Sequence, residues 1–323
     1  MISCLKMIYT INHVLRSKRH HFIFLFMLLL FESASHCLAG DTLKVMLTGD
    51  LLLDRGVRTE IERTNIDSLF VPWVDSLFTN SDVVVANLEC PATKIKAPVH
   101  KKYIFRGEPE WLPALRQHGI THLNLANNHS IDQGRRGLID TRDNILASGM
   151  TPIGAGATMD EAAEPVLLAS TPRNVWLIAS LRLALENYAY LTNRPCVSQE
   201  SIETLIDRIQ QLRATDPHCY IIVSLHWGGE NTMHPILQQI FDAHRMIDAG
   251  ADILVCHHSH TLQDIELYHG HRIYYSIGNF IFDLSKPHQC EACMVSIKIT
   301  GTASEVETIP VHIIDCRPQQ PVP

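Results

Sequence analysis

A short apolar run leads directly into three histidines in the segment Ile253-Leu254-Val255-Cys256-His257-His258-Ser259-His260. Consecutive aliphatic residues are typical of a buried strand, and the polar residues after such a strand lie at its carboxyl end. In an extended backbone His258 and His260 face one way and His257 the other, so the first two can share a cation. A metal-scavenging surface tract is the competing interpretation, but the buried strand before it argues against that. The segment therefore predicts a metal site at a sheet edge.

The same alternation of apolar strands with longer amphipathic stretches continues from Leu43 onward, which indicates an α/β fold. Strands are predicted at 43–47, 83–87, 121–125, 175–179, 220–225, 253–255, 273–276 and 294–299. Helices are predicted at 60–78, 109–118, 135–148, 200–214 and 235–249. Because open α/β sheets collect ligands at the carboxyl ends of their strands, we expect the polar residues after several strands to converge on one edge.

Polar side chains follow four of the other strands: Asp50, Glu89, the run Asn127 to His129, and His226. Taken alone, Asp50 is explained as well by a helix N-cap, and Glu89 by a surface position. The amide and imidazole groups of Asn128 and His129 are harder to explain by packing. An asparagine oxygen suits a divalent cation, and a nearby histidine can protonate a leaving group.

Further polar residues stand near these candidates. Asn87 lies two residues before Glu89 and shares its face of an extended segment. Gly228 and Gly229 follow His226, which indicates close approach of a ligand to the backbone. Asn279, which comes after an aromatic strand, can border the same edge. We expect Asn87, Asn127, Arg55 and Asn279 to be candidates for substrate contact.

The composition narrows the class of protein. Hydrophobic residues make up 46% of the chain and charged residues 19%, which excludes disordered and collagen-like chains. Nineteen histidines against 27 lysines and arginines favour metal binding or proton transfer near neutral pH. The formal charge is −7 for 323 residues, and residues 1–39 hold four basic side chains against one acidic, so the remainder carries about −10. An acidic surface argues against a nucleic-acid partner.

The N-terminus has the pattern of a targeting segment. Arg16, Lys18 and Arg19 precede the apolar run 22–31, and small residues follow it. That run is too short to span a bilayer, which takes about 20 residues. We therefore expect residues 1–39 to be a signal peptide and the protein to be exported to the periplasm or cell envelope. His36 stands where a lipoprotein signal needs a small residue, which argues against a lipid anchor at Cys37.

The remaining chain reads as one domain over 41–316 with a loose, proline-rich tail over 317–323. Seven cysteines remain after residue 39. Cys290 and Cys293 are the closest pair, and they form either a local disulfide or two inert thiols.

With these residues in hand, the chain resembles the CapA family of poly-γ-glutamate capsule biosynthesis proteins, within the calcineurin-like metallophosphoesterase fold. The resemblance spans roughly residues 43–285. It rests on an ordered series of motifs: Thr48-Gly49-Asp50, Asn87-Leu88-Glu89-Cys90-Pro91, Ala126-Asn127-Asn128-His129-Ser130-Ile131-Asp132, His226-Trp227-Gly228-Gly229-Glu230, Asp248-Ala249-Gly250-Ala251-Asp252, His257-His258-Ser259-His260 and Tyr275-Ser276-Ile277-Gly278-Asn279-Phe280. Such a series is far more specific than any one motif.

The resemblance implies a four-layer α/β/β/α sandwich with one or two divalent metal ions, of the Mn, Fe or Zn type, at the sheet ends. It implies the metal ligands Asp50, Glu89, Asn128, His226, His258 and His260. It also implies that His129 is the general acid.

The chain departs from the wider metallophosphoesterase pattern at two ligand positions. Asp50-Leu51-Leu52 stands where Asp-x-His is expected, and Glu89 where an aspartate is usual. Within the CapA pattern, Cys256 replaces a glycine and Ser259 a proline. A thiolate at position 256 could join the metal site.

The resemblance implies an exported metal-dependent hydrolase or transferase that acts in the biosynthesis, export or trimming of poly-γ-glutamate or a related anionic polymer. Membrane-bound polymer synthesis subunits are the expected protein partners. An acidic protein that handles a polyanion needs local cations, for which Arg55, Lys101, Lys102 and Arg106 are available. An extracytoplasmic phosphoesterase and a non-catalytic polymer-binding or scaffold subunit are the alternatives.

Overall fold

The structure is a computed structural model that describes residues 41–184, 192–284 and 286–321. The chain divides into two units, Met1–Asp41 and Thr42–Pro323, and apart from Asp41 the described residues belong to the second. The expected signal peptide and Cys37 lie outside the described residues. Within the described ranges, no helix combines the length and the apolar character needed to cross a membrane.

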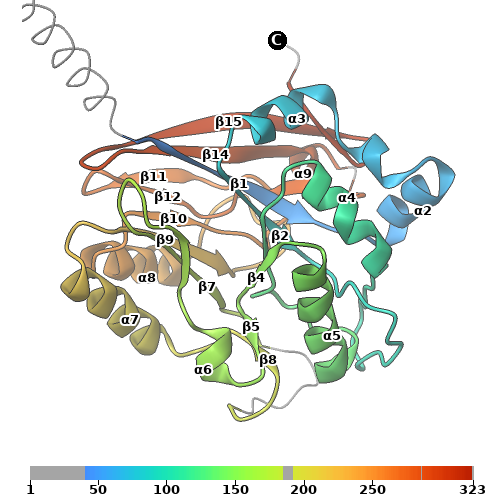
Figure 1. Cartoon of the computed structure of the whole chain (residues 1–323), viewed down its shortest axis with the longest axis horizontal. Helices are drawn as coiled ribbons and strands as arrows, with labels where there is room; N and C mark the ends of the chain where they lie inside the picture. Colours follow the sequence, from blue (N-terminus) through green and yellow to red (C-terminus); the bar gives the residue numbers. More distant parts are fainter. Residues whose placement is uncertain (1–40, 185–191, 285, 322–323) are drawn as a thin grey trace, which may run out of the picture. The chain divides into compact units, whose positions relative to one another are not determined.

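Two β-sheets form the centre of the second unit (Figure 1). The larger has the strand order β16-β15-β14-β1-β2-β3-β4, and β13 also pairs with β1. Its strands are β1 (Leu43–Leu51), β2 (Val83–Leu88), β3 (His122–Asn124), β4 (Thr151–Ile153), β13 (Asn279–Ile281), β14 (Glu291–Ile299), β15 (Ser304–Ile314) and β16 (Arg317–Gln319). Strands β1 to β4 run parallel, whereas β14 is antiparallel to β1.

The smaller sheet has the strand order β11-β12-β10-β9-β7-β6. Its strands are β6 (Val166–Ala169), β7 (Val175–Leu181), β9 (Tyr220–His226), β10 (Ile253–Val255), β11 (Ile265–Tyr268) and β12 (His271–Tyr274). Strands β7, β9, β10 and β12 are parallel neighbours. A separate pair joins β5 (Ala155–Gly156) to β8 (Cys196–Val197).

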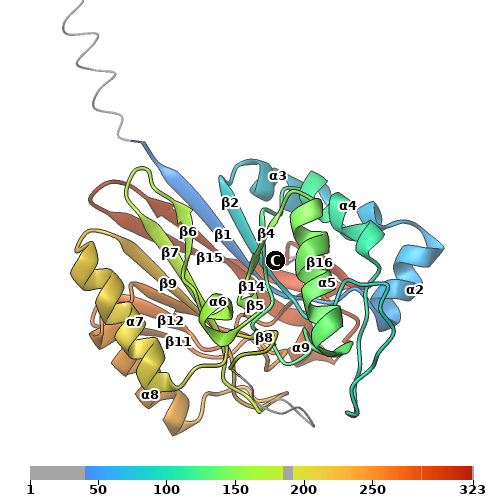
Figure 2. The same ribbon diagram turned by 60° about the horizontal axis from the view of Figure 1, so that its bottom comes forward.

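Helices cover the outer face of each sheet (Figures 1 and 2). The larger sheet packs against α2 (Arg55–Arg63), α3 (Pro72–Thr79), α4 (Leu112–Gln117) and α5 (Gly134–Ala147). The smaller sheet packs against α7 (Ile202–Thr215) and α8 (Leu237–Asp248). The short helical turns are η1 (Ile66–Leu69), η2 (Pro109–Trp111), α6 (Met159–Ala162) and α9 (Pro287–Cys290). This order of layers confirms the predicted α/β/β/α sandwich.

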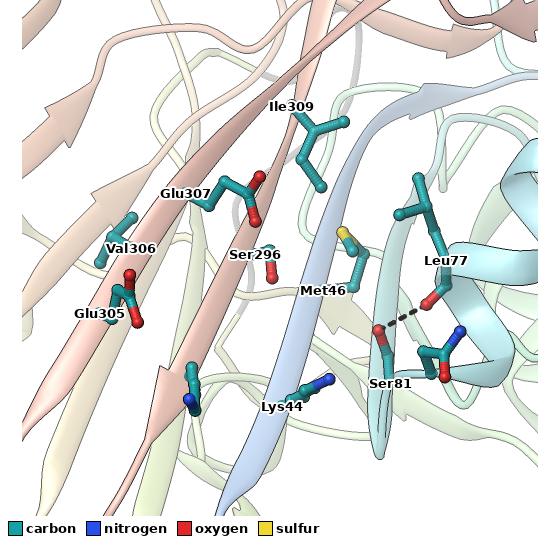
Figure 3. Close-up of a pocket in the computed structure, with 11 residues that line it drawn as sticks. Lys44, Met46, Leu77, Ser81, Ser296, Glu305, Val306, Glu307 and Ile309 are labelled. Atoms are coloured by element: carbon teal, nitrogen blue, oxygen red, sulfur yellow. Dashed lines mark hydrogen bonds between the residues drawn. The ribbon is translucent and has the colours of Figure 1, made fainter.

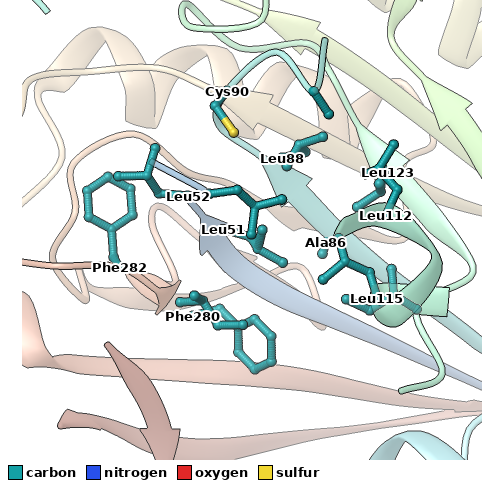
Figure 4. Packing of buried hydrophobic residues seen from close by; sticks show 14 of the residues in the cluster. Leu51, Leu52, Ala86, Leu88, Cys90, Leu112, Leu115, Leu123, Phe280 and Phe282 are labelled. Atoms are coloured by element: carbon teal, nitrogen blue, oxygen red, sulfur yellow. The ribbon is translucent and has the colours of Figure 1, made fainter. Parts of the chain in front are cut away.

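Alternating side chains divide the core between the layers, because successive residues of a strand face opposite ways. Val45 and Leu47 of β1 lie in the core between the two sheets, whereas Met46 faces the helices. Figure 4 shows the helix side, where Leu112 and Leu115 of α4 lie over the strands. Burying a leucine of this kind contributes roughly 1.5–3 kcal/mol, so this packing fixes the ends of β1 and β2, which carry site residues.

The predicted helix over 60–78 is wrong, because three separate elements, α2, η1 and α3, occupy that stretch. The side chain of Asn65 accepts a hydrogen bond from the Ser68 amide at 3.0 Å and begins η1. Pro72 then begins α3, and Val71 before it is extended. A proline disfavours helical backbone in the preceding residue, so the chain cannot pass through this point as one helix.

The C-terminal segment also differs from expectation. Arg317–Gln319, placed by the sequence in a loose tail, form β16 and pair with β15. Main-chain pairing with β15 orders this segment. Pro318 is compatible with that pairing because β16 is the edge strand, where a missing N–H breaks no ladder hydrogen bond. The seven cysteines from Cys90 onward are free, so the inert-thiol alternative holds for Cys290 and Cys293. Cys293 packs between the sheets, and Cys290 packs against the core beneath the helices.

A groove of about 540 Å³ lies on the outer face of the larger sheet, beside α3 (Figure 3). Lys44 and Met46 of β1 line it together with Glu305 and Glu307 of β15. Asp50 lies four to six residues further along β1 than these lining residues, which is roughly 13–20 Å in a strand. The groove is therefore separate from the predicted metal site.

Candidate metal centre

The predicted ligands come together where the strands of both sheets end. Asp50 lies in β1, Glu89 follows β2, and Asn128 follows β3 of the larger sheet. His226 ends β9, and the segment that holds His258 and His260 follows β10 of the smaller sheet. A bridge between His226 and His257 continues the β9–β10 pairing to this edge. The carboxyl ends of two sheets thus face each other across one buried site, as the strand pattern predicts.

Gly49 permits one close approach that sets the position of Asp50. A Cβ atom at residue 49 would collide with the carbonyl oxygen of Gly278. The Asp50 amide donates to that same oxygen at 3.1 Å, and Asp50 pairs in register with Asn279. The motif that holds Asp50 and the motif that holds Asn279 are therefore in direct contact at Gly49.

Glu89 is buried, and neither of its carboxylate oxygens has a hydrogen-bond partner among the described residues. Its Oε1 lies 3.5 Å from His226 Nε2 and 3.7 Å from His260 Nε2. Burial raises the pKa of Glu89 well above its usual value. A buried carboxylate without compensation is costly, so this environment suits a bound cation.

Two groups of donor atoms share Glu89. Within each group the ligand atoms lie within 4.8 Å of one another; the groups are Glu89, His226 and His258, and Asp50, Glu89 and His260. Asn128 Oδ1 adds an oxygen to the first group, 2.9 Å from His226 Nε2. Carboxylate, amide and imidazole donors in this combination are compatible with one or two divalent cations.

The histidines of the first group favour the neutral form, which is the form that binds metal. Burial lowers the pKa of His226 well below its usual value. Burial also lowers the pKa of His258, to about 3. Their facing nitrogens, His258 Nδ1 and His226 Nε2, are 3.1 Å apart. Two neutral imidazoles and an amide oxygen therefore point toward one small region.

The second group behaves differently, because it holds two carboxylates. Burial would raise the pKa of Asp50, but hydrogen bonds with His257 and His260 outweigh it and hold that pKa well below its usual value. Burial would lower the pKa of His260, but the charge of Glu89, followed by Asp50, raises it to about 10. A proton on His260 thus supplies the positive charge that the carboxylates require. A cation bound there would displace it.

The histidine loop is not extended, which corrects one prediction. His258 and His260 have φ angles of 98° and 56°, in the left-handed region that non-glycine residues rarely adopt. As a result His257 does not pack behind the site, and its Nδ1 lies 3.3 Å from Asp50 Oδ1. His258 and His260 still reach the same centre. Backbone strain of this kind accumulates at functional sites.

Cys256 does not join the site, which corrects the expectation of a thiolate ligand. Its side chain packs on the far side of the smaller sheet, in the core with Trp227 and Tyr275. Burial raises the pKa of the Cys256 thiol, so the group is neutral. A neutral thiol in an apolar core is a packing residue.

His129 follows the candidate ligand Asn128 in the chain and has a partner of its own. Its Nδ1 lies 2.8 Å from Asp132 Oδ2, and its ring stacks on Phe105 with the ring centres 4.1 Å apart. Burial lowers the pKa of His129, and Asp132 partly offsets that effect. Asp132 orients the imidazole, which leaves Nε2 to exchange a proton. The i,i+3 spacing of these two residues is the sequence signal that could have revealed Asp132.

A model of the bacterial capsule synthesis protein family, PGA_cap, matches residues 44–284. The chain belongs to this family. The "PGA biosynthesis protein CapA" of Bacillus subtilis is 32% identical over 282 residues, which cover 85% of this chain and 73% of the relative. The "Capsule biosynthesis protein CapA" of Bacillus anthracis is 28% identical, covering 87% of this chain and 70% of the relative.

Among solved structures, a Staphylococcus aureus protein assigned as a 5′-nucleotidase superposes with a TM-score of 0.51 at 11% identity. The match covers 83% of this chain and 53% of the other, so this chain spans about half of that protein. It shows a shared metallophosphoesterase-like fold. The family model and the CapA relatives confirm the resemblance to capsule biosynthesis proteins.

Three asparagines expected to touch substrate are used inside the protein. Asn127 Nδ2 donates to the oxygens of Asn87 and Leu88, and its Oδ1 accepts from His129 N at 3.1 Å and from Ser130 N at 2.9 Å. Asn87 Nδ2 donates to Asp50 Oδ1 at 2.8 Å. These bonds hold the loop that carries Asn128 and His129. In this chain the amides position the candidate ligands.

Asn279 and Lys101 have similar supporting positions. Asn279 Oδ1 lies 2.9 Å from His260 Nδ1, and its Nδ2 donates to Gln289 O at 3.0 Å. Lys101, expected to supply a cation for the polymer, has a side chain only 5% exposed. Its Nζ lies 3.0 Å from Asp132 Oδ1 and donates to Asn128 O at 3.0 Å. Lys101 therefore connects the His129–Asp132 pair to the loop that carries Asn128.

A cavity of about 220 Å³ opens beside the centre. His129 and the candidate ligand His260 both line it. Arg55, a predicted substrate contact, lines it as well. Lys102 and Arg106 do not line it: Lys102 lies over the Tyr103 ring, and Arg106 pairs with Glu108 at 2.5 Å.

Proposed function

We propose that this chain is an exported metal-dependent hydrolase or transferase that acts in the biosynthesis, export or trimming of poly-γ-glutamate or a related capsular polymer. The carboxylate of Glu89 carries the proposal, because both of its oxygens are buried without hydrogen bonds among the described residues and it belongs to both groups of candidate ligands. The names of the Bacillus relatives, one of them a PGA biosynthesis protein, support the polymer. Membrane-bound polymer synthesis subunits are the proposed protein partners.

The ligands Asp50, Glu89, Asn128, His226, His258 and His260 would hold one or two cations of the Mn, Fe or Zn type. When bound, such cations supply a Lewis acid and a water of lowered pKa.

The chain's own residues supply the proton transfer. His129 Nε2 is in position to donate a proton to the leaving nitrogen or oxygen, while Asp132 holds Nδ1. Phe105 stacks on the ring of His129 and shields it from water. General acid catalysis of this kind contributes roughly 10²–10⁴ in rate.

Elemental analysis of the protein purified without a histidine tag tests the metal. We expect about one to two equivalents in the wild type after reconstitution, and clearly less in His258→Ala. His234→Ala is the matched control, because the His234 side chain is 78% exposed and outside the centre. Less than about a tenth of an equivalent in the wild type would refute the metal centre, since preformed multi-ligand sites bind tightly.

A hydrolase screen separates the possible reactions. γ-Linked glutamate oligomers and a phosphate monoester are supplied to the reconstituted wild type and to His129→Ala. Cleavage of the oligomers that is lost in His129→Ala supports the proposal. Cleavage of the phosphate ester alone identifies a phosphoesterase. Polymer binding that persists in His226→Ala and His258→Ala, without metal or turnover in the wild type, identifies a scaffold subunit.

A further inference from the structure

Two cationic side chains line the cavity beside the centre. Arg55 and Lys286 line it, and Lys286 is exposed. Across the described residues, the Lys286 ammonium has no ion pair or hydrogen bond to a neighbouring side chain. Glu230 also lines the cavity, so charges of both signs face the same small space.

Contacts with Asp283 and Phe105 orient the guanidinium of Arg55. Its Nε lies 3.1 Å from Asp283 Oδ2, an oxygen that also accepts from the Gly56 amide at 2.9 Å. Its guanidinium lies 5.7 Å from the centre of the Phe105 ring. Neither terminal Nη has a partner among the residues that the structure describes. With five N–H donors on a guanidinium and only Nε in use, the planar fork is left for a ligand.

The backbone of Arg55 indicates that the arginine is kept for a purpose other than folding. Its φ angle is 56°, at the first residue of α2. Glycine and asparagine adopt that region readily, whereas a long side chain there costs free energy. A strained residue that lines a cavity and keeps unused donors is a candidate for ligand contact.

Apolar side chains complete the cavity next to these cations. Phe105 and Phe282 line it together with Leu284. A ligand that fits must combine an anionic group with a short apolar stem. A glutamyl unit, with a carboxylate carried on methylene groups, has that chemistry.

From these contacts we infer that Arg55, assisted by Lys286, forms a subsite that binds a carboxylate of the substrate beside the metal centre. This inference rests on the proposed function, because it places the anionic polymer in the cavity next to His129. Arg55 binds the carboxylate through its two Nη groups, and Glu230, which lines the same cavity, disfavours a second negative charge there. The subsite thereby selects a polymer unit by its charge and orients it toward the proton donor.

Isothermal titration of the full chain with tri-γ-glutamate tests the subsite. Every sample carries His129→Ala and Mn²⁺, so the probe is not turned over. We expect Arg55→Gln to weaken binding about tenfold to hundredfold, as for loss of a hydrogen-bonded charge pair. Lys286→Gln weakens it less, and Glu230→Gln strengthens it. Arg63→Gln, which removes the same charge from the exposed end of α2, leaves binding unchanged. Equal effects of Arg55→Gln and Arg63→Gln would overturn the subsite.

Arg55→Gly separates binding from folding. We expect the melting temperature to be unchanged or higher, because glycine accepts the positive φ, while tri-γ-glutamate binding is lost. A lower melting temperature with intact binding assigns Arg55 to the fold and overturns the inference. Inorganic phosphate is the second probe, and a dependence on Arg55 for phosphate alone overturns the assignment to a carboxylate.

The subsite and the proposed function fail in different ways. If the wild type does not cleave the oligomers but the binding series holds, the proposed reaction is wrong and the subsite stands. If the wild type cleaves them and Arg55→Gln binds normally, the reaction stands and the subsite is wrong.

Discussion

Replacing Glu89 by glutamine changes the residue that both groups of metal ligands share. We expect the Glu89→Gln protein to lose metal-dependent stabilisation. A cation at about 100 times its dissociation constant stabilises a folded protein by about 2.7 kcal/mol. For a domain of this size that corresponds to a rise in melting temperature of roughly 5–10 °C in the wild type. The amide oxygen keeps the shape of the side chain but not its charge, so the rise should disappear.

The metal-free variant gives the second half of this prediction. Two buried carboxylates, Asp50 and Glu89, face one protonated His260, and the Glu89 oxygens have no hydrogen bonds among the described residues. Glutamine leaves Asp50 and His260 paired one to one. The metal-free Glu89→Gln protein should therefore melt no lower than the metal-free wild type at pH 7.

Differential scanning calorimetry with and without Mn²⁺ measures both effects. Glu291→Gln is the control, because the Glu291 side chain is 59% exposed, pairs with His312 and belongs to neither group of candidate ligands. It should keep the full Mn²⁺ response. The reasoning is refuted if Glu89→Gln responds to Mn²⁺ as the wild type does, or if its metal-free form is clearly less stable.

Three further predictions concern Glu108, His129 and Leu88. Hydrogen bonds from Arg106, and then from Lys94 and Arg58, hold the pKa of Glu108 well below its usual value, so its stabilisation exists above about pH 4.5 and fades as the pH falls. Glu108→Gln should cost about 1 kcal/mol in urea unfolding at pH 7 and less at pH 3; an equal cost at both would contradict this. His129→Ala should lower kcat by about 10²–10⁴ with normal metal content by elemental analysis, and a lost metal would show that it is a ligand instead. Leu88→Ala should cost about 2–5 kcal/mol by the same unfolding assay, and a smaller value would mean that the core around β2 relaxes.

The sequence predicts the strands that are buried on both faces. Ile253–Val255 forms β10 with the predicted bounds, because an unbroken apolar run has few alternatives inside a sandwich. β15 was not predicted, since Glu305, Glu307 and Pro310 interrupt its apolar pattern. It forms because its main chain pairs with β14 along nine residues. Pairing of this kind depends on a partner strand and leaves little trace in the strand's own residues.

Likewise, the sequence predicts which residues belong to the centre, but it does not predict the contacts that set their roles. Polar residues after buried strands were found, because an apolar core excludes them unless they have a use. The contacts between these residues were not predicted, since residues such as Asp50 and His260 meet although 210 positions separate them in the chain. The left-handed backbone of His258 likewise reflects its fold environment, and no residue pattern in the loop predicts it. Because its contacts could not be predicted, Asn127 was expected at the substrate. In the structure its side-chain amide donates to Leu88 O and accepts from Ser130 N.

The candidate ligands are divided equally between the layers, which has a mechanical consequence. Asp50, Glu89 and Asn128 belong to the larger sheet, and the three histidines belong to the smaller one. A cation held by both sets would cross-link the two sheets, in addition to any role in chemistry. Its removal should loosen the register of one sheet against the other while each sheet keeps its own hydrogen bonds. Metal supply would then set the stiffness of the whole sandwich.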